Sequence, residues 1–254
     1  MRVAIIQANL AWEDPQKNRD HFESKISELA GNADLVVLPE MFTTGFTMNA
    51  TALAEPADGE THQWLEECSK KYNIAITGSV ITTESGKFYN RLFFITPSGQ
   101  SLKYDKRHLF SYAGEDKIFT SGRHKLIVEY MGWRICPLIC YDLRFPVFSR
   151  NVESYDLLIY VANWPEVRIT AWDTLLKARA IENMSYVVGV NRIGTDGNGH
   201  SYIGHSQVVD YLGRSIISPA EDEQVSIAEL HKQELDETRG KLRFLDDKDN
   251  FILK

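Results

Sequence analysis

The sequence predicts one α/β domain whose sheets are covered by helices on both faces. Short apolar runs alternate with amphipathic segments along all 254 residues, which is too regular a pattern for an all-β protein. The apolar runs are continuous rather than alternating, as in strands that are buried on both sides. Because no repeat or flexible linker interrupts this pattern, we expect a single domain over 1–254.

The first half of the chain contains four predicted strands and two predicted helices: strands at 3–7, 35–38, 74–81 and 88–95, and helices at 18–30 and 62–72. The helix at 18–30 has Phe22, Ile26 and Leu29 at helical spacing, and a Gly-Asn pair follows it as a stop signal. Pro39 ends the second strand.

The second half is predicted to add strands at 126–130, 133–139, 157–161, 186–190, 206–209 and 225–230. Thr170 and Asp173 resemble a capping box, so we expect a helix to begin there. The tail 244–254 is charged but ends in the apolar run Phe251-Ile252-Leu253. Packing on the body, contact with a second subunit and a frayed end are the alternatives for this tail.

Composition excludes several classes of protein. Apolar residues make up 43% and charged residues 25%, as in ordinary globular proteins. The net charge of −7, without a basic run, argues against nucleic-acid binding. No stretch approaches the roughly 18 apolar residues of a membrane span. The odd, sparse set of three cysteines suits a reducing compartment, so we expect a cytoplasmic protein.

Cys140 is a candidate nucleophile, because it lies at the end of a predicted apolar strand and is followed by a polar turn. Ligands of α/β proteins usually bind at strand ends, and a thiol there can attack a substrate if a neighbouring group favours the thiolate. A lone cysteine in such a place is more often structural, and Cys136 and Cys68 are expected to be core residues.

Two further charged residues are candidates for the chemistry. Glu40 ends the strand at 35–38 and has the chemistry of a general base, although a loop charge or a helix cap is the common alternative. Lys106 could present a fixed positive charge to an oxyanion, although most single lysines face solvent. His108 lies near Lys106 and could form a catalytic pair with a cysteine, but its local sequence favours a structural or orienting role.

Taken together, these segments resemble the nitrilase superfamily of carbon–nitrogen hydrolases. The resemblance extends from residue 2 to about residue 230, and the matching motifs are LPE at 38–40, YDKRHLF at 104–110, ICYDLRFP at 139–146, YVANWP at 160–165, KARAIEN at 177–183 and VNRIG at 190–194.

The resemblance implies a four-layer α-β-β-α sandwich and a Glu–Lys–Cys triad. Glu40 would be the general base, Cys140 the nucleophile, and Lys106 the stabiliser of the tetrahedral intermediate. The backbone N–H of Tyr141 would be the second oxyanion donor. Glu115 is the candidate for the second glutamate that many members use, with Asp116 as its neighbouring competitor.

Within the superfamily, YDKRHLF and the run at 132–151 look most like the ω-amidase branch. Such enzymes release ammonia from the terminal amide of small dicarboxylic monoamides, including 2-oxoglutaramate and succinamate. The free carboxylate of such a substrate needs a cation, and Arg144 and Arg168 are candidates for bidentate binding. Trp164 and Phe42 are candidate pocket walls, although an orienting, surface or core role is the alternative for each of the four.

No cofactor or metal is expected, because the histidines lack paired zinc-ligand spacing. The expected partners are a small amide substrate and a second copy of the chain, since members commonly form dimers through their outer helices. The segment 177–183 and the apolar tail would contribute to that interface. The alternatives are a nitrilase or an N-carbamoyl amide hydrolase, and a binding protein that kept the fold without the chemistry.

Overall fold

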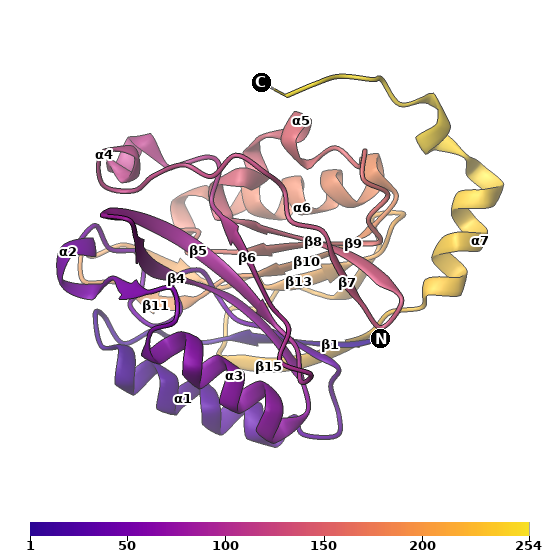
Figure 1. Ribbon diagram of the computed structural model, residues 1–254. Helices are drawn as coiled ribbons and strands as arrows, with labels where there is room; N and C mark the ends of the chain where they lie inside the picture. Colours follow the sequence, from indigo (N-terminus) through magenta and orange to yellow (C-terminus); the bar gives the residue numbers. More distant parts are fainter. Residues whose placement is uncertain (254) are drawn as a thin grey trace.

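Two β-sheets lie face to face at the centre of the structure, and helices cover the outer face of each (Figure 1). The computed structural model describes residues 1–253. This arrangement is the four-layer α-β-β-α sandwich that the sequence resemblance implies. None of the helices within residues 1–253 has the length and apolar character needed to span a bilayer.

The first sheet has seven strands in the order β15-β1-β2-β4-β5-β6, with β3 paired to β4. Strands β1, β2 and β4 run parallel, and β5 and β6 continue the sheet antiparallel. The bounds of its strands are β1 Arg2–Gln7, β2 Leu35–Val37, β3 Glu55–Pro56, β4 Ala75–Glu84, β5 Lys87–Ile95, β6 Ser101–Asp105 and β15 Gln224–Glu229.

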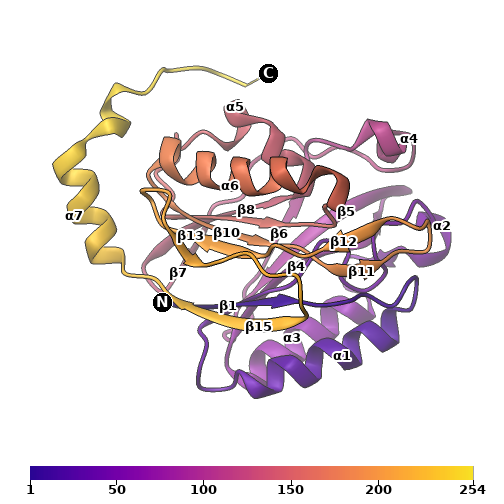
Figure 2. The same cartoon turned by 180° about the vertical axis from the view of Figure 1, so that it is seen from behind.

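The second sheet has six strands in the order β14-β13-β10-β9-β8-β7, and its central strands β8, β9 and β10 are parallel. A separate hairpin of β11 and β12 lies beside α2 at one end of the sandwich (Figure 2). The bounds are β7 Val128–Tyr130, β8 Trp133–Ile139, β9 Leu157–Val161, β10 Tyr186–Val190, β11 Ile193–Thr195, β12 Ser201–Ile203, β13 Gln207–Val209 and β14 Ser215–Ile217.

Helices α1 and α3 cover the first sheet, and α6 covers the second (Figure 1). The remaining helices are short or lie at the edge of the sandwich. Within residues 1–253 the α-helices are α1 Pro15–Glu28, α2 Ala50–Leu53, α3 Glu60–Tyr72, α4 Glu115–Ile118, α5 Pro146–Ser149, α6 Ile169–Asn183 and α7 Lys232–Leu242.

Strand β1 shows why the apolar runs are continuous. Successive side chains of a strand point to opposite faces. Val3 and Ile5 belong to the core that includes the second sheet, whereas Ala4 and Ile6 pack with Phe22 of α1. Both faces of the strand are therefore buried, which accounts for its continuous apolar run from Val3 to Ile6.

Close packing of α6 on the second sheet depends on Gly189 in β10. A Cβ atom at this position would lie 2.5 Å from Leu176 and 2.8 Å from Trp172, both on α6. These distances are too short for real carbon contacts, so a side chain at position 189 would push the helix away from the sheet.

The capping box expected at the start of α6 is wrong. The helix begins one residue earlier, with Arg168 at its N-cap position. The carboxylate of Asp173 instead accepts hydrogen bonds of 2.9 Å from His205 and from Gln207. Asp173 therefore makes tertiary contacts and does not cap the helix.

Helix α7 was not predicted, because only Leu235 on it is buried and its apolar pattern is weak. Polar contacts attach the helix to the second sheet. Asp156 is 2% exposed and accepts hydrogen bonds from Arg239 at 2.9 Å, from Lys232 at 2.8 Å and from the backbone N–H of Arg134 at 2.9 Å. One buried carboxylate therefore joins α7 to β8 and β9.

We expect Asp156→Ala to lower the free energy of unfolding by about 2 kcal/mol, because it leaves Arg239 and Lys232 without their anion. Urea denaturation would measure the change. Asp236→Ala is the matched control: Asp236 is 54% exposed and 3.5 Å from Lys232, so its loss should cost at most about 0.5 kcal/mol. Equal effects of the two substitutions would contradict this account of α7.

Candidate active site

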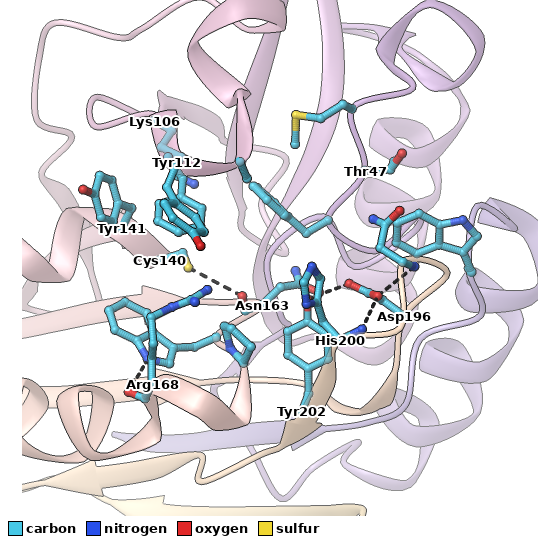
Figure 3. Close-up of a pocket in the computed structure, with 18 of the residues that line it drawn as sticks. Thr47, Lys106, Tyr112, Cys140, Tyr141, Asn163, Arg168, Asp196, His200 and Tyr202 are labelled. Atoms are coloured by element: carbon cyan, nitrogen blue, oxygen red, sulfur yellow. Dashed lines mark hydrogen bonds between the residues drawn. The ribbon is translucent and has the colours of Figure 1, made fainter.

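Both sheets contribute to one site. Glu40 follows β2 and Lys106 follows β6 in the first sheet, whereas Cys140 follows β8 in the second. Glu40 and Lys106 are buried, and Cys140 is partly exposed in a pocket of about 600 Å³ (Figure 3). The structure thus brings together Glu40, Lys106 and Cys140, the three side chains singled out from the sequence.

The ammonium of Lys106 lies between two buried carboxylates. Its Nζ donates to Glu40 Oε1 at 2.8 Å and to the two oxygens of Glu115 at 3.0 and 2.9 Å. Asn90 Nδ2 donates to the same two carboxylates at 2.8 and 3.1 Å, and the N–H of Phe110 donates to Glu115 at 2.6 Å. Glu115 therefore lies in the site, as expected from its position after the lysine loop.

Charge compensation sets the protonation of these groups. Burial alone would lower the pKa of Lys106, but the charges of Glu115 and Glu40 outweigh it and raise that pKa, so the amine stays charged. Burial, followed by Glu40, raises the pKa of the Cys140 thiol well above its usual value, while Lys106 opposes the shift. Cys140 is thus a thiol in this structure.

Cys140 lies on a sharp turn between β8 and a 3-10 helix at Cys140–Arg144. Its φ is +42°, in the left-handed region that non-glycine residues avoid at a cost of order 1 kcal/mol. The turn directs the thiol into the pocket, where Sγ lies 3.9 Å from the carbonyl oxygen of Asn163 (Figure 3). Tyr141 supplies the next backbone N–H after the nucleophile.

Two asparagines of the site were not identified from sequence. Asn163, which follows β9, donates its backbone N–H to Glu40 Oε2 at 2.9 Å and its Nδ2 to the carbonyl oxygen of Glu40 at 2.5 Å. Asn90 is one of three polar residues in β5, beside Lys87 and Arg91, and nothing in the local sequence distinguished it. Asn163 lies in the YVANWP motif, which carried a family signal but no assigned role.

Other pocket residues come from loops that sequence reasoning did not connect with the site. The hairpin β11–β12 and the loops after β1 and β2 also line the pocket (Figure 3). The lining residues that were missed include Trp12, Glu13, Phe46, Thr47, Tyr112, Asp196, His200 and Tyr202.

The candidate substrate-binding residues Arg144, Trp164 and Arg168 all line the pocket. The guanidinium of Arg144 lies 4.8 Å from the centre of the Trp164 ring, and that of Arg168 lies 5.2 Å from the centre of the Phe110 ring. Among residues 1–253, no carboxylate forms an ion pair with either arginine. Two cations in the pocket are therefore available to an anionic ligand.

Phe42 is a correction, because it is not a pocket wall. Its ring is fully buried beneath α1 and α3, where it packs against Phe22 at 5.5 Å and Trp64 at 5.9 Å between ring centres. The chain turns at Met41, whose φ is +43°, and this turn sends the side chain of Phe42 to the helix side of the sheet.

Across residues 1–253, no group of three His, Cys, Asp or Glu side chains is arranged to hold a metal ion. The positive charge at the reacting centre comes from Lys106, held by Glu40 and Glu115.

Comparison with known proteins identifies the class. The sequence model of the carbon-nitrogen hydrolase family matches residues 2–240, and the chain belongs to this family. It is similar to omega-amidase YafV from Yersinia enterocolitica (44% identity, covering 100% of this chain and 98% of the relative) and from Escherichia coli K12 (45%, covering 100% and 98%). It is also similar to the 2-oxoglutaramate amidase of Bacillus subtilis, at 32% identity over 96% of each chain.

Solved structures agree with this assignment. The CN-hydrolase superfamily protein XC1258 from Xanthomonas campestris, described with an arsenic adduct in its active site, superposes with a TM-score of 0.98 at 44% identity. That match covers 100% of this chain and 99% of the other. The amidase from Nesterenkonia, at 24% identity and a TM-score of 0.84 over 96% and 95% of the chains, shares the fold. The resemblance found in the sequence is confirmed.

We expect Glu40→Gln to lower the pKa of Cys140, because it removes a negative charge that raises this pKa. The pH dependence of Cys140 alkylation by iodoacetamide should then shift its midpoint to lower pH. Glu115→Gln is the matched control, with a smaller shift in the same direction, since Glu115 is a weaker contributor. A midpoint that moves to higher pH in Glu40→Gln would show that the carboxylate does not act on the thiol in this way.

Proposed function

We propose that this protein is an ω-amidase that hydrolyses the terminal amide of small dicarboxylic monoamides, such as 2-oxoglutaramate or succinamate, to a carboxylate and ammonia. The observation that carries this proposal is the pocket itself, where a thiol, its neighbouring carboxylate and a buried ammonium lie together with two arginines that lack an acidic partner. The names of the similar omega-amidases and of the 2-oxoglutaramate amidase support the same substrate class.

In the proposed reaction, Cys140 attacks the amide carbon while Glu40 takes the thiol proton. The amide oxygen becomes an oxyanion, which the ammonium of Lys106 and the backbone N–H of Tyr141 stabilise. Glu40 then returns its proton to the departing nitrogen, ammonia leaves, and a thioester with Cys140 remains. Because both proton transfers use one carboxylate, Glu40 must lie close to both the thiol and the leaving group.

Hydrolysis of the thioester repeats this sequence, with water as the nucleophile and the thiol of Cys140 as the leaving group. Glu40 accepts a proton from water as the water attacks the thioester carbon, and the second oxyanion uses the same donors. The carbon–sulfur bond breaks, Cys140 regains the proton, and the product carboxylate leaves. Glu115 positions Lys106 throughout, through the hydrogen bonds of 2.9 and 3.0 Å to its ammonium.

Arg144 and Arg168 are proposed to bind the free carboxylate of the substrate. A guanidinium matches a carboxylate with two parallel hydrogen bonds. Stacking on Trp164 and on Phe110 orients the two planar groups, which lowers the entropy lost when a ligand binds. In Figure 3, Arg168 lies on the side of the pocket where Cys140 is found.

We also propose that residues 1–254 form one hydrolase domain that associates as a homodimer in the cytoplasm. Exposed apolar side chains support the dimer: Ile181 on α6 is 54% exposed and Val147 on α5 is 53% exposed. These helices and the end of the tail lie on the same side of the sandwich (Figures 1 and 2), and Ile252 in the tail is 91% exposed. The three free thiols suit a reducing compartment.

The substrate class is tested by ammonia release from 2-oxoglutaramate, succinamate, glutamine, a simple nitrile and an N-carbamoyl amino acid. We expect turnover of the two dicarboxylic monoamides, and loss of at least about 10³-fold in Cys140→Ala, which keeps the fold but lacks the nucleophile. Turnover of the nitrile, or carbon dioxide release from the carbamoyl compound, would indicate the other hydrolase activities. Inactivity of the wild type on the whole panel would favour a binding protein.

Carboxylate recognition is tested with Arg144→Met and Arg168→Met, which keep the length of the side chain and remove its charge. Each should raise KM for succinamate by about tenfold or more and leave the slow hydrolysis of uncharged butyramide unchanged. Arg214→Met, at a side chain 73% exposed outside the pocket, is the control. If neither pocket variant changes the ratio between the two substrates, the carboxylate is bound elsewhere.

A further inference from the structure

The spacing between Lys106 and Cys140 depends on how the two sheets are joined. Lys106 follows β6 of the first sheet, and Cys140 follows β8 of the second. These strands share no ladder of backbone hydrogen bonds. Side chains that cross between the two strand ends must therefore set the distance between the ammonium and the thiol.

Asp142 is the side chain that makes this connection. It lies two residues after Cys140, is fully buried, and accepts four hydrogen bonds. Oδ2 accepts from the hydroxyl of Tyr104 at 2.7 Å and from the N–H of Ile139 at 3.0 Å. Oδ1 accepts from the N–H of His108 at 3.0 Å and from its Nδ1 at 2.7 Å.

The partners of Asp142 flank the two reacting residues. Tyr104 and His108 lie two residues before and two residues after Lys106. Ile139 is the residue immediately before Cys140, so its bond to Asp142 closes the turn in which the nucleophile has a left-handed φ. One carboxylate thus holds both sides of the lysine segment and both sides of the nucleophile.

The groups around Asp142 are fixed in their donor roles. A carboxylate only accepts hydrogen bonds, so Nδ1 of His108 carries a proton. The ring of His108 stacks on Phe145 with 3.8 Å between ring centres and an angle of 6° between the planes. Burial raises the pKa of Tyr104 well above its usual value, which keeps its hydroxyl a donor, and the same hydroxyl accepts the N–H of Arg107 at 3.1 Å.

We propose that Asp142 is a positioning residue that fixes the ammonium of Lys106 relative to the thiol of Cys140, with Tyr104 and His108 as its two contacts on the lysine segment. This inference rests on the proposed roles of Lys106 and Cys140. A misplacement of about 1 Å in a catalytic group can cost about 100-fold in rate. Asp142 therefore acts on the reaction through geometry, without touching the substrate.

The test is Asp142→Asn, which keeps the size of the side chain. It replaces one carboxylate oxygen by an NH2 group, which is itself a donor and cannot accept hydrogen bonds from the neighbouring donors. We expect kcat to fall about 100-fold with KM changed less than about threefold, because the oxyanion donor is displaced while the carboxylate site remains. In the same variant, the midpoint of Cys140 alkylation should move to higher pH, because the nearby ammonium that lowers the thiol pKa has moved.

The direction of that shift separates positioning from a plain charge effect. Loss of a negative charge would by itself move the midpoint to lower pH, whereas displacement of Lys106 moves it to higher pH. Asp156→Ala is the control for lost stability. Asp156 joins α7 to the second sheet at the start of β9, which is the end of the β8–β9 pair away from Cys140. Its folded fraction should keep the wild-type kcat and alkylation midpoint.

If Asp142→Asn does not fold, Tyr104→Phe removes one of the four hydrogen bonds at nearly constant volume. It should lower kcat in the same manner by a smaller factor and shift the midpoint in the same direction. Wild-type kcat and midpoint in a folded Asp142→Asn, or in Tyr104→Phe where the first variant does not fold, would overturn the proposal. Because alkylation needs no substrate, a wild type inactive on monoamides would refute the proposed function and leave this test of Asp142 intact.

Discussion

The ion pairs of Lys106 with Glu40 and Glu115 are the interaction on which the site depends. Three charged groups cannot be buried together unless each has close partners, because the cost of leaving water far exceeds the stability of a domain. Here one ammonium satisfies two carboxylates, and Asn90 donates to both of them. Removing Lys106 would leave two buried carboxylates without a counter-ion, so the local structure depends on the same ammonium that the proposed reaction uses.

The site depends on how the two sheets of the sandwich pack together. Glu40 and Lys106 come from one sheet and Cys140 from the other, so the sheets must be packed in a fixed register before the site exists. Contacts across the sheets maintain that register: Asn163 donates to Glu40, and Asp142 accepts from Tyr104 and His108. The core between the sheets supplies cohesion, and these polar contacts supply alignment.

Much of this was predictable from sequence where the signal is local. The continuous apolar strands before Glu40 and Cys140 located the ends of β2 and β8. Lys106 was identified from its motif, and the strand before it, β6, was not predicted. The sequence pattern did not predict the positions of side chains that depend on the three-dimensional path of the chain after a strand. Phe42 faces the helices because the chain turns at Met41, and Asn90 looks like an ordinary strand residue until its carboxylate partners are in place. Helix α7 escaped prediction because polar contacts with Asp156 hold it.

The left-handed backbone at Cys140 has a consequence for how this protein can evolve. Glycine or asparagine would occupy that conformation with less strain, so selection for stability alone would favour replacing Cys140. Under the proposed mechanism, selection for turnover is what keeps the cysteine at this position. A lineage that loses its need for the reaction would be expected to exchange this residue early, well before the surrounding sandwich shows any drift.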